Sequence, residues 1–160
     1  MSRYLTLTLL LFFAVPAPAH ESKPQIDVPE AAKAAVESVD SFFAALSKGN
    51  LDGAGALLDP GVIILEAGGA EHSATEYLGG HAKGDVEFLK GSHLQLLRRS
   101  ARVSGDLAWV ASESELHVEK NGKPMSLAST ETMVLRSTHS GWKIVHVHWS
   151  SRAKKPGDSH

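Results

Sequence analysis

The second half of the chain consists of strand-forming runs that follow one another with only short turns between them. The four runs occupy residues 94–103, 107–119, 125–136 and 142–151. Turn-forming residues separate them at Ser104-Gly105-Asp106, Asn121-Gly122 and Ser140-Gly141. Turns this short leave no room for crossover helices, so we expect the four strands to pair in antiparallel order.

The first half of the chain predicts helices. Apolar residues recur every three to four positions from Val28 to Leu46, Pro29 suits a first helical turn, and Gly49 ends the pattern. Asn50 can cap a second helix that runs to residue 57 or 58. Helices followed by a meander predict an α+β fold, in which the N-terminal helices pack on the concave face of a curved antiparallel sheet.

Between these halves, residues 62–66 predict a short buried strand that ends in the carboxylate Glu66. Ser73-Ala74-Thr75-Glu76 has the spacing of a capping box, and Gly79-Gly80 cuts the helix short. The segment from 67 to 93 is rich in glycine and histidine, and we expect it to form the rim of a site.

The N-terminus has the pattern of a secretory signal peptide. Arg3 precedes an apolar run from Leu5 to Val15, and the small residues of 16–19 suit cleavage before His20. The apolar run is shorter than the about 20 residues that a membrane helix needs. We therefore expect a signal peptide at 1–19, export to the periplasm or the medium, and no membrane attachment after cleavage.

The rest of the chain suits one domain of ordinary size. We expect a flexible arm at 20–28, the domain at 29–152 and a flexible tail at 153–160. The chain has no cysteine, which excludes disulfides and thiolate metal sites, and its formal net charge of −2 gives no support for nucleic-acid binding. We expect no cofactor.

The last strand carries His146 and His148 two residues apart, which places both imidazoles on one face. Simple alternation puts Trp142 and Ile144 on that face as well, whereas Val145, Val147 and Trp149 take the other. Imidazole titrates near neutral pH, so the pair can act as general acid and base in a pocket. The other interpretation is packing at a dimer interface, and the sequence does not decide which face looks inward.

The order of elements, Glu131-Thr132, the run from Gly141 to His148 and Ser150 resemble the nuclear transport factor 2-like superfamily. Within it, the chain is most similar to SnoaL-like exported bacterial proteins and to the association domain of calcium/calmodulin-dependent kinase II, which has a similar His-x-His-x-Ser. The resemblance implies a cone-shaped, cystatin-like barrel with a pocket between sheet and helices, and assembly as a homodimer or larger. It implies no single chemistry.

The known enzymes of that superfamily are matched only in part. A ketosteroid isomerase pattern needs a tyrosine donor with aspartates in an apolar pocket. Tyr77 is the single tyrosine after the predicted leader, and no aspartate falls inside a predicted strand. We therefore do not transfer a specific activity from the resemblance.

Further candidates for the pocket share polar or aromatic character and positions at strand ends or on strand faces. They are Glu66, His72, Tyr77, His81, Trp109, Glu113 and Glu131. Glu131 lies among apolar and hydroxyl residues, which favours a buried carboxylate. For the loop residues, plain surface exposure is the alternative.

Three function classes follow. The preferred one is a small-molecule-binding domain with an apolar pocket and His-mediated proton transfer of the isomerase, cyclase or dehydratase type. The second is a binding or oligomerisation module without chemistry. The third is a metal-binding protein that uses His146 and His148 with His72 or His81, or the new N-terminal His20; we expect no metal in the preferred class.

Overall fold

The computed structural model describes residues 23–120, 122–155 and 158. The predicted signal peptide and the start of the predicted arm lie outside the described residues. In the part of the chain that is described, no helix is long and apolar enough to cross a membrane.

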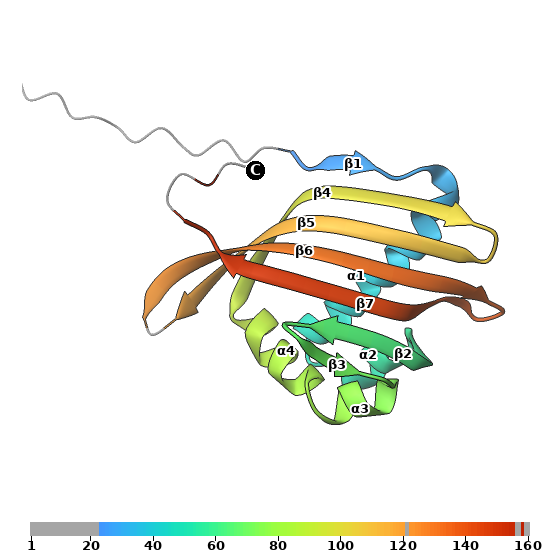
Figure 1. The fold of residues 1–160 in the computed structure, drawn as a ribbon, viewed down its shortest axis with the longest axis horizontal. Helices are drawn as coiled ribbons and strands as arrows, with labels where there is room; N and C mark the ends of the chain where they lie inside the picture. Colours follow the sequence, from blue (N-terminus) through green and yellow to red (C-terminus); the bar gives the residue numbers. More distant parts are fainter. Residues whose placement is uncertain (1–22, 121, 156–157, 159–160) are drawn as a thin grey trace, which may run out of the picture.

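A curved seven-stranded sheet forms the body of the molecule, with the strand order β1-β4-β5-β6-β7-β2-β3 (Figure 1). Four long antiparallel strands build its centre: β4 Ser92–Ser104, β5 Leu107–Lys120, β6 Lys123–Thr138 and β7 Gly141–Ala153. This confirms the predicted meander. The remaining strands are β1 Gln25–Asp27, β2 Leu58–Glu66 and β3 Gly69–Glu71.

The strands that flank the central meander differ from the sequence-based expectation. β2 begins at Leu58 rather than residue 62, because Leu58 already pairs in parallel with Ile144 of β7. The second helix is correspondingly shorter than expected. β1 falls inside the segment predicted to be a flexible arm, and it pairs in parallel with β4.

The helices gather behind the sheet and below it in Figure 1. They are the 3-10 turn η1 Glu30–Ala32, then α1 Lys33–Ser47, α2 Leu51–Gly55, α3 Ala74–Gly79 and α4 Ala82–Lys90. The amide of Gly53 donates to Asn50 Oδ1 at 2.9 Å, and that of Glu76 donates to Ser73 Oγ at 3.1 Å, so both predicted caps are formed. The α+β class with helices on one face of the sheet is confirmed.

The core lies between α1 and the inner face of the sheet. Phe42 is fully buried, and its ring stacks on Trp149 with centroids 6.3 Å apart. Tyr77 is also fully buried and contacts both rings. Phe43, one residue further on α1, is only partly buried and packs at the edge of this cluster.

A β-bulge in β7 changes which side chains face the core. Val134 pairs with His146 while Leu135 pairs with Ile144, so Val145 is the extra residue. Ile144, Val147 and Trp149 therefore all face inward. The expected sharing of a face by Ile144 and the two histidines was wrong, because alternation fails at the bulge.

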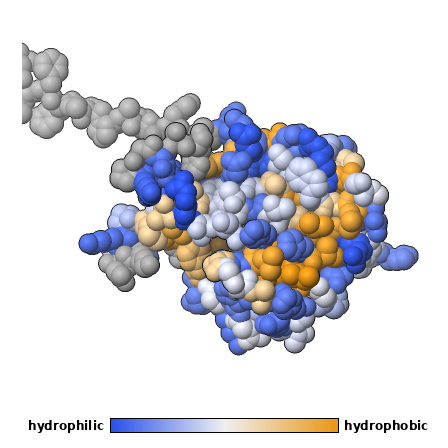
Figure 2. Space-filling view, in the orientation of Figure 1, coloured by the Kyte–Doolittle hydropathy of each residue, from blue (hydrophilic) through white to orange (hydrophobic). Residues whose placement is uncertain are grey.

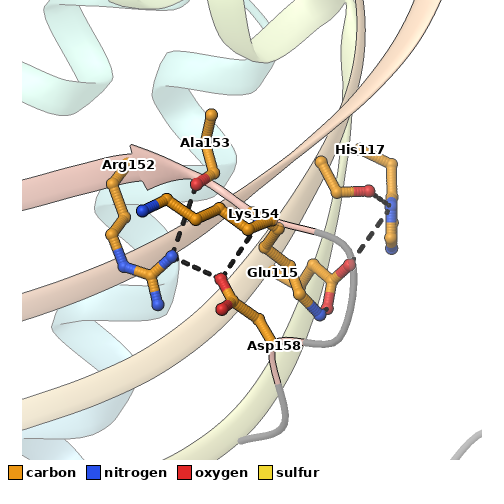
Figure 3. A network of polar contacts seen from close by, with 8 residues as sticks. Glu115, His117, Arg152, Ala153, Lys154 and Asp158 are labelled. Atoms are coloured by element: carbon orange, nitrogen blue, oxygen red, sulfur yellow. Dashed lines mark hydrogen bonds and ion pairs between the residues drawn. The ribbon is translucent and has the colours of Figure 1, made fainter.

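Residues after β7 continue along the sheet rather than leaving it at once. Lys154 Nζ donates to Glu115 Oε2 at 2.6 Å, and Arg152 forms an ion pair with Asp158 (Figure 3). Lys155 also donates its amide to Asp158 Oδ2. These contacts hold the described part of the predicted tail against β5 and β7.

Phe42→Ala should lower the free energy of unfolding by about 3–5 kcal/mol, because it removes a fully buried aromatic ring and leaves a cavity. Phe43→Ala is the matched control on the next position, and it should cost about 1–2 kcal/mol because that ring loses less buried area. Urea denaturation followed by circular dichroism measures both. Equal losses in the two variants would contradict this packing.

Candidate functional site

A cavity of about 350 Å³ opens between α1, α4 and the inner face of the sheet. Its apolar lining comes from Phe43, Leu46, Phe88, Leu89, Leu94, Leu116, Leu127 and Trp149. Six serines also line the cavity, and four of them, Ser112, Ser114, Ser129 and Ser151, come from β5, β6 and β7. Because inward-facing positions alternate along β5 and β6, small hydroxyl residues there leave space where larger side chains would fill the cone.

Glu131 is the buried carboxyl of the cavity wall. It lies on β6 with 7% of its surface exposed. Trp149 Nε1 donates to its Oε2 at 2.8 Å, and Ser112 Oγ donates to its Oε1 at 3.3 Å. The three residues sit on neighbouring strands β5, β6 and β7, so the sheet register itself brings them together.

A buried arginine extends this network to α1. Arg99 Nε donates to Ser112 Oγ at 3.2 Å, and its guanidinium pairs with the carboxylate of Asp40. Ser112 thus accepts from Arg99 and donates to Glu131. The resulting chain of hydrogen bonds runs in one direction, from the Arg99 guanidinium to Glu131.

Burial dominates the electrostatics of Glu131. It raises the pKa of this carboxyl to about 6, against the opposing effects of the Trp149 and Ser112 hydrogen bonds and the Arg99 charge. Glu131 therefore exchanges a proton close to neutral pH, which is the property that a general acid or base requires.

A second polar cluster lies at another part of the cavity wall, where β2 and β3 meet α4. Glu66 and Asp85 line the cavity, and His81 lies between them. His81 Nε2 is 3.7 Å from Glu66 Oε2 and 3.8 Å from Asp85 Oδ1, while His81 Nδ1 is 2.9 Å from Glu71 Oε1. Tyr77 donates its hydroxyl to Asp85 Oδ2 at 2.7 Å.

The charges of this second cluster perturb one another. Burial, reinforced by the neighbouring acidic groups, raises the pKa of Glu66, and burial likewise raises the pKa of Asp85. Burial opposes protonation of His81, but the surrounding carboxylates outweigh it and raise the pKa of the imidazole. Burial, with Asp85 beside the hydroxyl, also raises the pKa of Tyr77 far above its ordinary value.

Four of the residues selected from the sequence lie at or beside the cavity. Glu66 and Glu131 line it, Tyr77 is buried next to it, and His81 contacts Glu66. His72 is exposed, and its amide donates to Glu76 Oε2 at 2.8 Å. It is not among the residues that line the cavity.

The other selected residues share the opposite, outer face of the sheet. Trp109 is 40% exposed, and Glu113 forms an ion pair with Arg98. His146 Nδ1 lies 3.0 Å from the carbonyl oxygen of Ile63, and His148 is exposed. The structure therefore does not place the histidine pair, Trp109 or Glu113 in the cavity.

Several residues of the site did not emerge from the sequence. Arg99, Ser112 and Trp149 belong to the Glu131 network, and Asp85 belongs to the histidine cluster. Alternation along β5 could have identified Ser112. One face of that strand carries Ala108, Val110, Ser112 and Leu116, so Ser112 lies on the same face as the apolar inner residues.

Three solved structures show what this chain is similar to. A candidate ketosteroid isomerase from Shewanella frigidimarina is 34% identical with a TM-score of 0.70, over 78% of this chain and 99% of that one. A candidate calcium/calmodulin-dependent protein kinase II association domain from Xanthomonas campestris is 21% identical with a TM-score of 0.66, over 84% and 97% of the two chains. A nuclear transport factor 2-like protein of cystatin-like fold from Novosphingobium aromaticivorans is 16% identical with a TM-score of 0.64, over 75% and 80%.

The last two likenesses show the fold alone. Among curated proteins, none matches this sequence. The SnoaL-like domain, in contrast, matches residues 36–154, which include most of α1 and the whole central meander. The chain therefore belongs to the SnoaL-like domain family.

Proposed function

We propose that this protein binds a small, mainly apolar organic molecule with a carbonyl or hydroxyl oxygen, and that Glu131 exchanges a proton with it. The observation that carries the proposal is the buried carboxyl of Glu131 in the wall of a cavity that is also lined by eight large apolar side chains. The volume of about 350 Å³ falls in the range of ligand pockets, which begins near 300 Å³.

The hydrogen bonds of Glu131 favour a ligand that carries an oxygen atom. Trp149 and Ser112 both donate to this carboxyl, and the Ser112 oxygen already accepts from Arg99. When Glu131 is protonated, its own O–H becomes a donor that can turn to an acceptor in the cavity. A ligand carbonyl or hydroxyl oxygen in the cavity supplies that acceptor.

The reaction class we propose is proton transfer next to a carbonyl group, as in an isomerisation. The relative that is 34% identical is a candidate ketosteroid isomerase, and a dehydratase candidate from Streptomyces avermitilis shares the fold. Because His146 and His148 lie on the outer face, the proposal assigns the proton transfer to Glu131. We also propose, from the N-terminal sequence, that the protein acts after export.

A cavity-filling substitution tests ligand binding. Ser129→Leu should abolish binding, because Ser129 lines the cavity and the larger side chain occupies its space. The matched control is Thr130→Leu, which makes a similar change on the exposed outer face of the same strand. Tryptophan fluorescence with a panel of cyclic ketones and small acids measures affinity; binding that survives in Ser129→Leu refutes this cavity as the ligand site.

Glu131→Gln tests the proton exchange. In the wild type, the indole N–H resonance of Trp149 should shift with a midpoint at about pH 6, because that N–H donates to Glu131. In the variant, no such step should occur. Proton NMR measures the titration, and a midpoint near 4.5, the ordinary value of a glutamate, would contradict the buried site.

The same group gives stability a definite pH dependence. The folded pKa of about 6 exceeds the ordinary 4.5, so the stabilisation is fully present below 4.5 and is lost as pH rises through 6. Relative to Glu131→Gln, the wild type should lose about 2 kcal/mol over this window, at 1.36 kcal/mol per pKa unit. Urea unfolding of both proteins between pH 4 and 7 measures the difference between their free energies of unfolding. A difference that does not change with pH would mean that Glu131 is solvated.

We propose, as a second function, self-association through the outer face of the sheet. Trp109, Val134, His146 and Ile63 are successive register partners across β5, β6, β7 and β2. Trp109 and Ile63 are 40% and 42% exposed, and apolar groups gather on this face in Figure 2. A candidate kinase association domain shares the fold, and an apolar row of this kind suits an isologous dimer.

Ile63→Lys tests this interface. Burying an unpaired lysine in a dimer should raise the dissociation constant of the homodimer at least about tenfold, as for a central interface residue. Ile26→Lys is the control, since Ile26 is also exposed but lies on the edge strand β1. Light scattering after gel filtration measures the mass against concentration; a monomeric wild type, or equal effects of both variants, would refute the interface.

A further inference from the structure

The cluster at the junction of β2, β3 and α4 has the composition of a metal site. His81 and Asp85 lie four residues apart, one turn of α4, and Glu66 ends β2 beside them. One ligand atom from each of the three residues lies within 4.8 Å of the other two. We propose that Glu66, His81 and Asp85 bind one divalent transition-metal ion, with zinc as the best fit.

The residues behind these ligands hold them in a metal-binding orientation. Glu71 Oε1 lies 2.9 Å from His81 Nδ1, so that nitrogen carries the proton and Nε2 keeps its lone pair for the ion. The Tyr77 hydroxyl binds Asp85 Oδ2, which leaves Oδ1 directed at His81. In zinc sites, the histidine ring nitrogen that does not bind the metal usually donates a hydrogen bond, often to a carboxylate.

The charge balance of the cluster also calls for a cation. Glu66, Glu71 and Asp85 converge on one imidazole, and among the described residues no lysine or arginine forms an ion pair with any of the three. Glu66 Oε2 is buried and has no hydrogen-bond partner. Buried oxygens without a partner are costly, and a bound ion satisfies this one.

Protonation of His81 does not give Glu66 Oε2 the hydrogen-bond partner that it lacks. The imidazole reaches Glu71 through Nδ1, but Nε2 stands 3.7 Å from Glu66 Oε2 and 3.8 Å from Asp85 Oδ1, beyond hydrogen-bond distance. An ion between these atoms, with bonds of about 2.0–2.2 Å, draws its ligands to about 3.4 Å from one another. The two histidine distances are already close to that value.

The donor set selects the type of ion. One imidazole nitrogen and two carboxylates suit zinc or a neighbouring transition metal, whereas calcium and magnesium prefer oxygen alone. Because Glu66 and Asp85 line the cavity, the fourth coordination position faces it. The site therefore adds a function beyond the proton exchange proposed for Glu131, and neither depends on the other.

Isothermal titration calorimetry of the untagged protein with Zn²⁺ tests the proposal. We expect one saturable site per chain and a higher melting temperature with the ion, and no comparable response to Mg²⁺ or Ca²⁺. Glu66→Gln, Asp85→Asn and His81→Gln keep the size of each side chain and should each weaken Zn²⁺ at least about tenfold. Glu71→Gln, which changes only the group behind His81, should weaken it about 10–100-fold.

His117→Gln is the matched control. His117 has a side-chain exposure of 43%, close to the 42% of His81, and it also lies 3.8 Å from a glutamate, but it is outside the cluster. Zn²⁺ affinity should stay within about twofold of the wild type in this variant, given ordinary non-additivity. Circular dichroism melts confirm that each variant folds.

Two results would overturn the assignment. One is the absence of saturable Zn²⁺ binding to the folded wild type. The other is binding that persists in Glu66→Gln and Asp85→Asn but disappears in the double variant His146→Gln, His148→Gln, which would move the ion to the outer face of the sheet.

Discussion

Trp149 joins the hydrophobic core of this protein to the floor of its cavity, and the inner face of the sheet depends on that one side chain. Its ring stacks on Phe42 of α1, and its indole nitrogen donates to Glu131. A carboxyl that is 7% exposed needs such a donor to be tolerated at all. The contact that fixes α1 on the sheet therefore also fixes the group that can exchange a proton.

The fold could be predicted because its signals are local. Turn residues and alternation define the meander, and a three-to-four spacing defines α1, without knowledge of any distant contact. The parts that failed depend on pairing between distant segments. Leu58 joins β2 because Ile144 is its partner, and Gln25 begins β1 because it lies beside β4. Neither short segment has a strand pattern strong enough to be recognised alone.

The site was harder to predict for a related reason. A buried polar residue on a strand is defined by its cross-strand neighbours, and Ser112, Glu131 and Trp149 are brought together only by the register of β5, β6 and β7. The histidines attracted interest because their chemistry is conspicuous in a sequence. Simple alternation also gave these histidines the wrong neighbours. Because Val145 is an extra residue in a bulge, Ile144 faces inward with Val147, whereas both histidines face outward.

Alternation along β6 explains how one sheet can serve two purposes. Ser129 and Glu131 face the cavity, while Thr130 between them and Thr132 after them face outward beside Ser150 and His148. A substitution on one face adds or removes volume only on that side, since the backbone of a paired strand lies between them. The proposed ligand recognition and the proposed self-association would therefore use separate faces of the sheet, and the fold is shared by an enzyme candidate and a candidate association domain.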